Sequence, residues 1–130
     1  MGTSLPIYVN TAPVNVVALA GAEPATGTQI TDLNGVGCGG SLIRGVQGVL
    51  ATTGGAVTIS IYDGATVATS RQYYSVVLTY AGALTQLSDT QEPGIPALGI
   101  GLFVTIFGDA AAAGKTFSLL PYLQKLSIGS

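Results

Sequence analysis

The chain has 130 residues, a formal net charge of −2, one cysteine and no histidine or tryptophan. Only 8% of its residues are charged, whereas a typical soluble domain has about 25%. The single cysteine excludes an intrachain disulfide, and the absence of a basic patch argues against nucleic-acid binding.

A chain of this length is expected to form one domain with its own core. We therefore expect residues 1–130 to form a single β-domain, with residues 1–20 as an extended N-terminal arm or as an ordinary first strand. A monomer usually covers its surface with charged side chains, and four basic plus six acidic residues cannot do so. The composition predicts that other subunits cover part of the surface; the alternative is a surface that is polar without charge.

Residues 1–22 carry no charged side chain, which is one feature of a signal peptide. The segment has no Lys or Arg, however, and Pro6, Asn10 and Pro13 interrupt any apolar stretch. Other uncharged runs, such as 93–108, are short and rich in glycine, so no spanning helix is expected. The sequence predicts a protein made in the cytoplasm without a targeting segment.

The first half of the chain predicts strands separated by loops of turn-forming residues. Strands are expected at 14–19 and 41–51, with loops at 21–28 and 32–40. Two glycines inside the second strand, Gly45 and Gly48, indicate a bulge or a close backbone approach. The Gly-Gly pair in residues 52–55 predicts a hairpin to the next strand.

Residues 56–64, "AVTISIYDG", alternate with a period of two. The pattern predicts a strand that directs Val57, Ile59 and Ile61 into the core. Thr58, Ser60 and Tyr62 would then form an uncharged outer face, which a neighbouring subunit could cover. Asp63-Gly64 is a turn dipeptide that ends the strand.

The second half continues this pattern. Residues 73–80 are aromatic and β-branched, as strands are, and 83–91 could be a short helix or a further strand. Residues 100–108 alternate with apolar side chains on both faces, which predicts a strand covered on both sides. Residues 109–114 predict a turn or short helical piece. Residues 115–123 predict a final strand, in which Pro121 suits a sheet edge. Together these elements predict an all-β fold, an antiparallel β-sandwich or jelly-roll-like barrel of about seven or eight short strands.

Two segments resemble nucleotide-binding motifs. Gly35–Gly40 matches G-x-G-x-x-G, but a strand-like run follows it where the dinucleotide motif needs a helix. Residues 108–116 resemble a P-loop with one residue too many between the glycines. We interpret the first as a turned loop and the second as a hairpin between two strands.

The chain offers few groups for catalysis. Cys38 has no histidine to activate it, and a small buried cysteine is the simpler interpretation. One cysteine without histidine argues against a zinc site, and no calcium-loop motif is present. The carboxylates are predicted in turns, although the sequence alone cannot exclude a spatially paired set. We expect no catalytic, cofactor-binding or metal-binding residues and no enzyme activity.

Tyrosines are the strongest candidates for contact residues. Tyr73-Tyr74 could form a platform for a partner or a glycan, although one of two adjacent strand aromatics is usually in the core. The uncharged N-terminal segment could contact a shell or a neighbouring copy. The candidate interface residues are Ile7, Tyr8, Val9, Tyr62, Tyr73 and Tyr74.

About half of the chain resembles small β-sandwich structural proteins of tailed bacteriophages. The matching pieces are "IRGVQG" (43–48), "VTISIYDG" (57–64), "GLFV" (101–104) and "TFSLLPY" (116–122). These patterns mainly encode strands and turns, and the first forty residues carry no part of the resemblance.

The resemblance implies a non-enzymatic virion protein, either a capsid decoration (cement) protein or a head–tail accessory protein. Such proteins are often homotrimers seated on the major capsid protein lattice. The implied partners are copies of the chain itself and that lattice, with no nucleic acid, membrane or cofactor. The implied location is the capsid surface after synthesis in the host cytoplasm. The alternative is a receptor- or glycan-binding module of a phage tail or surface appendage.

Overall fold

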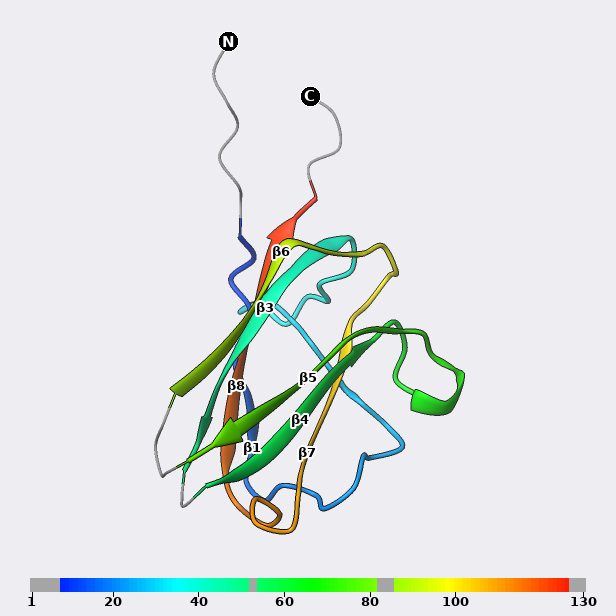
Figure 1. The fold of residues 1–130 in the computed structure, drawn as a ribbon. Helices are drawn as coiled ribbons and strands as arrows, with labels where there is room; N and C mark the ends of the chain where they lie inside the picture. Colours follow the sequence, from blue (N-terminus) through cyan, green and yellow to red (C-terminus); the bar gives the residue numbers. More distant parts are fainter. Residues whose placement is uncertain (1–7, 52–53, 82–85, 127–130) are drawn as a thin grey trace.

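The computed structural model describes residues 8–51, 54–81 and 86–126, which form two four-stranded antiparallel sheets packed face to face (Figure 1). One sheet has the strand order β1-β8-β3-β6 and the other β2-β7-β4-β5. The elements are β1 (Val14–Val16), β2 (Thr28–Gln29), β3 (Ser41–Leu50), β4 (Gly55–Tyr62), the 3-10 turn η1 (Val67–Thr69), β5 (Gln72–Tyr80), β6 (Gln86–Ala97), β7 (Phe103–Gly108) and β8 (Phe117–Lys125).

The chain crosses from one sheet to the other at every connection except the one between β4 and β5. Eight strands arranged in this order form a jelly roll, a fold of two sheets with Greek-key connections. The predicted all-β sandwich is confirmed, and the strand order identifies it as a jelly roll.

This topology shows that both predicted hairpins are wrong. β3 and β4, which flank the predicted hairpin at 52–55, lie in opposite sheets, and residues 52–53 lie outside the described residues. β7 and β8, which flank residues 109–116, also lie in opposite sheets. Each of these strand pairs therefore belongs to two sheets and is not a pair of hydrogen-bonded neighbours.

The alternation in β4 is confirmed, since Val57, Ile59 and Ile61 are completely buried between the sheets. The outer face of the same strand is also partly covered, because Ser60 and Tyr62 are only 3% and 5% exposed. The Tyr62 hydroxyl donates to Glu23 Oε2 at 2.6 Å, and Glu23 lies in the connection from β1 to β2. This chain's own connection, rather than another subunit, therefore covers that part of the strand.

Both interior glycines of β3 have the roles predicted for them. The register of β3 with both neighbouring strands shifts between Ile43 and Gly45, and Gly45 has a φ of +138°. At Gly48, a Cβ atom would overlap the ring of Phe117. The Gly48 carbonyl also accepts a hydrogen bond of 2.6 Å from the Tyr80 hydroxyl. One glycine therefore forms the bulge, and the other admits aromatic side chains close to the backbone.

The prediction that Pro121 lies in an edge strand is wrong, because β8 lies between β1 and β3. On the β1 side, however, the pairing is interrupted: Tyr8 pairs with Gln124, and Val14–Val16 pair with 117–119. Pro121 lies in the gap between these pairs, where the Thr11 hydroxyl donates to its carbonyl at 2.8 Å. The missing N–H of proline therefore costs no hydrogen bond with β1.

The remaining predictions for the second half are mixed. Buried Val104, Thr105 and Ile106 confirm that β7 is covered on both faces. The strand begins at Phe103, however, and Ile100, predicted to lie in it, is fully exposed at 101%. Residues 86–91 belong to strand β6 rather than to a helix, and residues 83–85 lie outside the described residues.

Two tyrosines of β5 connect the sheets and predict a pH-dependent stability. Tyr74 donates to Asp89 Oδ2 of β6 at 2.5 Å, and Tyr80 donates to the Gly48 carbonyl of β3. Burial, followed by the hydrogen bond and charge of Asp89, raises the pKa of Tyr74; burial raises the pKa of Tyr80 from 10.0 to about 12. A pKa raised by folding stabilises the fold below the unfolded value, and this contribution is lost as pH rises through the folded value.

We therefore expect the free energy of unfolding to fall between pH 10 and pH 12. Urea unfolding across this range would measure it, with tyrosinate absorbance as a second readout. Tyr80→Phe should show a smaller loss, since it removes one of the tyrosine hydroxyls whose pKa is raised. An equal pH dependence in wild type and variant would contradict this assignment.

Candidate interaction surface

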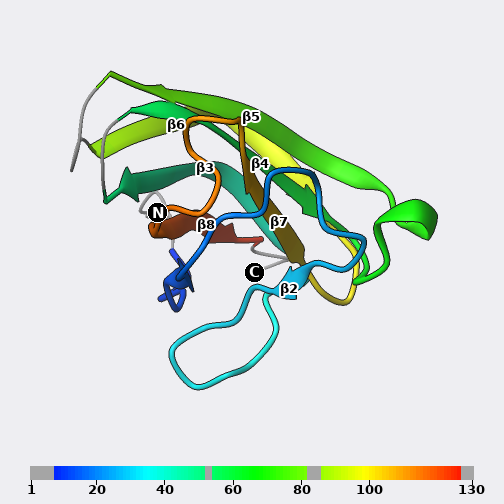
Figure 2. The ribbon, with the colours of Figure 1, turned by 90° about the horizontal axis from the view of Figure 1, so that it is seen from below.

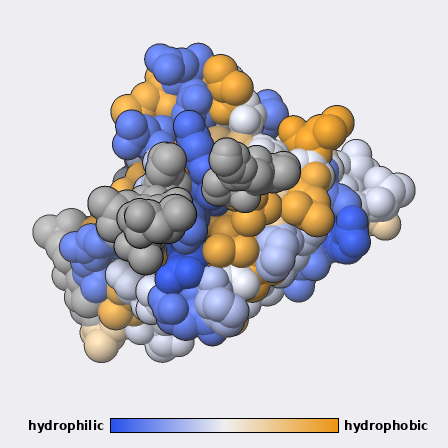
Figure 3. Space-filling view, turned by 90° about the horizontal axis from the view of Figure 1, so that it is seen from above, coloured by the Kyte–Doolittle hydropathy of each residue, from blue (hydrophilic) through white to orange (hydrophobic). Residues whose placement is uncertain are grey.

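Exposed apolar side chains gather at one end of the sandwich. It is the end at which the described part of the chain begins and ends (Figure 1). Of the seven large apolar side chains exposed in the described part of the chain, five come from segments at this end. We call these five the apolar end: Tyr8 (52% exposed), Leu33 (68%), Val36 (59%), Leu98 (74%) and Ile100 (101%). Figure 3 views this end and shows apolar patches between polar residues.

The connection from β2 to β3 presents two of these side chains on an ordered loop. Asp32 Oδ1 accepts hydrogen bonds from the backbone N–H groups of Asn34 at 2.8 Å and Val36 at 3.0 Å. The Leu33 N–H donates to the Asn10 carbonyl at 2.9 Å, which ties the loop to the segment before β1. The backbone is therefore satisfied locally, and the apolar side chains of Leu33 and Val36 remain outside.

The connection from β6 to β7 presents the other pair beside the first loop. The Gly40 N–H donates to the carbonyls of Ala97 at 3.0 Å and Gly99 at 3.2 Å, which joins the two connections. The Gly99 N–H donates to the Tyr73 hydroxyl at 3.1 Å. Leu98 and Ile100 therefore extend from a loop that is bonded to both sheets.

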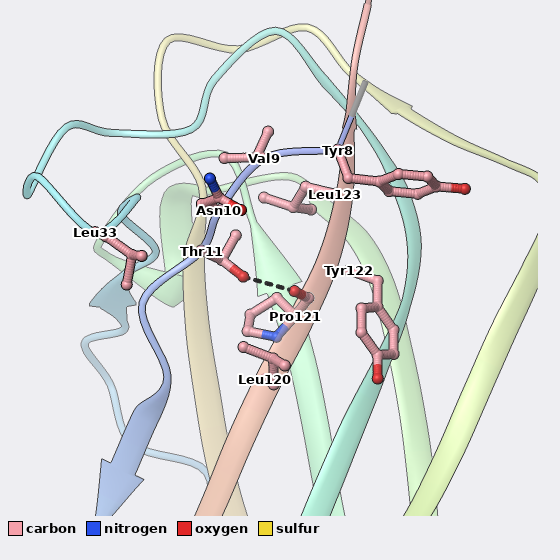
Figure 4. Close-up of a pocket in the computed structure, with 9 residues that line it drawn as sticks. All are labelled: Tyr8, Val9, Asn10, Thr11, Leu33, Leu120, Pro121, Tyr122 and Leu123. Carbon is pink, nitrogen blue, oxygen red and sulfur yellow. Dashed lines mark hydrogen bonds between the residues drawn. The ribbon is translucent and has the colours of Figure 1, made fainter. Parts of the chain in front are cut away.

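A groove of about 440 Å³ runs beside the apolar end, between β8 and the segment before β1 (Figure 4). None of its lining residues is charged: Tyr8, Val9, Asn10, Thr11, Leu33, Leu120, Pro121, Tyr122 and Leu123. An adjoining hollow of about 340 Å³ shares part of this lining and adds Asp32, Asn34 and Lys125. The groove is therefore mainly apolar, and the charged side chains line only the adjoining hollow.

The predicted contact residues separate into two groups. Tyr8 and Val9 line the groove, and Ile7 lies outside the described residues. Tyr62 and Tyr74 are 5% and 4% exposed, and both donate hydrogen bonds to carboxylates of the same chain.

Tyr73 is intermediate in exposure, since its side chain is half-buried. The Arg71 guanidinium lies 5.5 Å from the centroid of its ring. Of the adjacent pair, Tyr74 is therefore the core residue. Only Tyr73 retains surface for a partner or a glycan.

Sequence reasoning missed Leu33, Val36, Leu98 and Ile100. Residues 32–40 were expected to form only a turned loop, and Ile100 to belong to a strand. A signal was nevertheless present, because large apolar residues stand among the glycines of "DLNGVG" and "ALGIG". Apolar side chains in a surface loop have no core to enter, so they remain available for a partner.

The candidate nucleophile Cys38 lies in the core and is 5% exposed. Burial, and then the nearby Asp32 carboxylate, raise the pKa of the thiol. A higher pKa disfavours the thiolate that nucleophilic chemistry requires. The structure therefore places Cys38 as a small core side chain.

Each of the six carboxylates is engaged within the chain. Side-chain groups donate hydrogen bonds to two of them: Tyr62 and Thr105 to Glu23, and Tyr74 and Gln91 to Asp89. Backbone N–H groups donate to Asp32 and Asp109. Arginines pair with the other two, Arg71 with Asp63 and Arg44 with Glu92. These contacts connect loops and strands, as expected for structural carboxylates.

Neither nucleotide-like motif has the geometry that its function needs. Strand β3 follows Gly35–Gly40, so no helix N-terminus meets that loop. In the segment after β7, Asp109 Oδ1 accepts hydrogen bonds from Ala111 and Ala112, both at 3.0 Å. These N–H groups hold the pKa of Asp109 below its usual value, Ala112 contributing most. A carboxylate therefore occupies the position where a phosphate would bind.

Within residues 8–51, 54–81 and 86–126, no group of three or more Cys, Asp or Glu side chains could hold a metal ion. The same residues contain no helix long and apolar enough to cross a membrane.

No protein-family model matches the chain, and the curated proteins contain no match. Among solved structures, the chain is similar to a protein of Bacillus endospore appendages, described as a family of disulfide-linked pili. The two share 20% sequence identity with a TM-score of 0.40, and the alignment covers 98% of this chain and 96% of the other. A likeness at this TM-score supports no conclusion about function.

Proposed function

We propose that this chain is a non-enzymatic structural protein of a virus particle, namely a capsid decoration protein that binds the assembled head shell as a homo-oligomer. The supporting observation is the apolar end, where five of the seven exposed large apolar side chains in the described residues gather. Concentrated exposed apolar surface marks a contact site in a soluble protein. The low charge of the chain and its resemblance to phage structural proteins agree with this role.

The mechanism is interfacial. A protein that binds the assembled lattice but not the loose subunits stabilises the lattice by mass action. Joining several copies turns weak contacts into high avidity, because each later contact is intramolecular. The family resemblance implies three copies, whereas a two-fold contact along the free edge of β5 would give two. The jelly roll supplies a rigid frame, and its two ordered loops present Leu33, Val36, Leu98 and Ile100 to the shell.

The proposed partners are copies of this chain and the major capsid protein lattice, without nucleic acid, membrane or cofactor. The proposed location is the capsid surface, after synthesis in the host cytoplasm. A non-enzymatic role is supported by the engaged carboxylates and by the raised pKa of the Cys38 thiol. Jelly rolls also serve as viral capsid and lectin domains, so the fold permits both this function and the alternative below.

The test is co-sedimentation with head shells of the parent phage purified without this protein. We expect wild type to bind, and the double variant Leu98→Glu/Ile100→Glu to bind at least about tenfold more weakly, since it places two charges against an apolar contact. Val17→Glu is the matched control, because Val17 is 83% exposed but does not belong to the apolar end.

Unchanged binding by the double variant would show that the apolar end is not the contact. Failure of wild type to bind shells would reject the decoration role. Thermal unfolding of each variant checks that the fold is intact, and all three replaced side chains are exposed.

The alternative is a receptor- or glycan-binding module. It is favoured by the hollow of about 340 Å³, which combines the exposed Tyr8 ring with Asn10, Asp32, Asn34 and Lys125. An aromatic ring beside hydrogen-bonding side chains suits a sugar. Retention of wild type on an immobilised glycan surface, together with absence from head shells, would favour this alternative.

A further inference from the structure

The two sheets have four edge strands, and these edges differ in their capacity to pair with another chain. A sheet edge exposes unpaired backbone N–H and C=O groups, which form a template for strand addition. β1 and β6 border one sheet, and β2 and β5 border the other. β1 has three residues and follows Pro13, and β2 has two residues. Edges this short offer few backbone groups to a partner.

β6 is long, but it carries several features that block pairing. Pro93 and Pro96 lie within it, and Gly94 has a φ of +108°. Asp89 pairs in register with buried Val46 and accepts the hydrogen bond of Tyr74, so its charge lies on the inner side of this edge. Prolines, irregular backbone and inward charges are the means by which natural proteins protect edge strands.

Of these features β5 has only a bulge near its start, where Tyr73 is the extra residue opposite β4. Its nine residues, "QYYSVVLTY", contain no proline, glycine or charge and are rich in aromatic and β-branched residues. It pairs only with β4, and among the described residues no backbone hydrogen bond joins Gln72–Tyr80 to any other segment. Figure 2 shows β5 as the outermost strand of its sheet, with no described segment beyond it. Val77, on the outer face of β5, is 56% exposed.

We propose that β5 pairs antiparallel with β5 of a second copy across a two-fold axis, joining two four-stranded sheets into one. This inference deepens the proposed function by naming a contact between copies, and it rests on that function for the expectation of self-assembly. A two-fold contact is self-complementary, so the same strand supplies both halves of the interface.

The distribution of charge favours a second copy in this orientation. A strand without charge meets an identical strand without like-charge repulsion. The nearest charge is Arg71, directly before β5, which pairs with Asp63 of its own chain. Antiparallel pairing over the whole strand places the two Arg71 residues at opposite ends, about 30 Å apart. Parallel pairing would place them side by side.

The two-fold axis keeps the sheet faces in common, and the register proposed is the one centred on Val76, which spans Gln72–Tyr80. Val76 lies opposite Val76 of the second copy, and Ser75 lies opposite Val77. The two Val77 side chains are then diagonal neighbours on the outer face, close enough for two charges placed there to repel.

The experiment is light scattering over a series of protein concentrations, combined with amide hydrogen exchange. We expect twice the mass of one chain. We also expect the exchange of β5 amides to slow as concentration rises, while that of the β6 amides does not change. Val77→Lys should weaken self-association at least about tenfold through like-charge repulsion. Ser88→Lys is the matched control, since Ser88 is exposed on the edge strand of the other sheet.

A monomer or a trimer as the only wild-type species, an unchanged association of Val77→Lys, or an equal effect of Ser88→Lys would each overturn the inference. If Val77→Lys failed to fold, the hydrogen exchange of β5 amides compared with β6 amides in the wild type would still test the contact. A trimer that binds head shells would overturn this contact and leave the proposed function intact. A dimer paired through β5 that does not bind head shells would support this contact and reject the proposed function.

Discussion

Replacing Gly45 with alanine is expected to lower the free energy of unfolding by about 2–4 kcal/mol. Gly45 forms the bulge of β3 and has a φ of +138°, a conformation that side chains with a Cβ rarely adopt. The added Cβ would also overlap the backbone carbonyl oxygen of Asp89 in β6. Because that oxygen belongs to a paired strand, it cannot move without disturbing the sheet.

Urea unfolding of Gly45→Ala would measure the loss, with Gly114→Ala as the matched control. Gly114 has a φ of +81° but no atom within 4 Å of an added Cβ. The control should therefore cost only the conformational strain, about 1–2 kcal/mol. Equal losses in the two variants would show that the close approach of Asp89 adds nothing.

The second large effect is expected at Phe117, a fully buried side chain in β8. Its ring centroid lies 6.1 Å from that of Tyr80 in an edge-to-face arrangement, and its ring fills the space left by Gly48. Phe117→Ala should lower the free energy of unfolding by about 3–5 kcal/mol, through lost burial and the cavity it leaves.

A double-mutant cycle with Gly48→Ala tests this packing. In wild type an added Cβ at Gly48 would overlap the Phe117 ring, whereas in Phe117→Ala it would enter the cavity. We expect a coupling energy of at least about 1 kcal/mol in this direction. Leu123→Ala is the control, since Leu123 is fully buried in the same strand but pairs in register with Ile43. If both cycles gave the same coupling, the contact between Gly48 and Phe117 would not be specific.

Part of the candidate surface was accessible from sequence. Tyr8 and Val9 were predicted as contact residues and line the groove. Tyr62 and Tyr74 were predicted by the same reasoning, yet their rings are buried and their hydroxyls are bonded to Glu23 and Asp89. These carboxylates lie 39 and 15 residues away along the chain. No local pattern shows whether a distant loop will cover an aromatic side chain.

The sequence by itself determined the local properties of this protein. Alternation identified Val57, Ile59 and Ile61 as core residues, and interior glycines identified the bulge and the close approach in β3. These properties depend on the period of side chains along one strand and on the conformations that one residue allows, so neighbouring residues encode them.

Only the tertiary structure decided which strands are neighbours. Gly54-Gly55 suits a hairpin, and Pro121 suits an edge, yet β3 and β4 lie in opposite sheets and β8 lies inside its sheet. The tertiary structure also left β5, a long strand without proline, glycine or charge, at a sheet edge. It gathered Leu33, Val36, Leu98 and Ile100 at one end. The physical reason is that strand pairing in a jelly roll joins segments far apart in sequence. The pairing is stabilised only when the inner faces of both sheets are buried against each other. The residues of one strand therefore do not specify which strand lies beside it in the sheet.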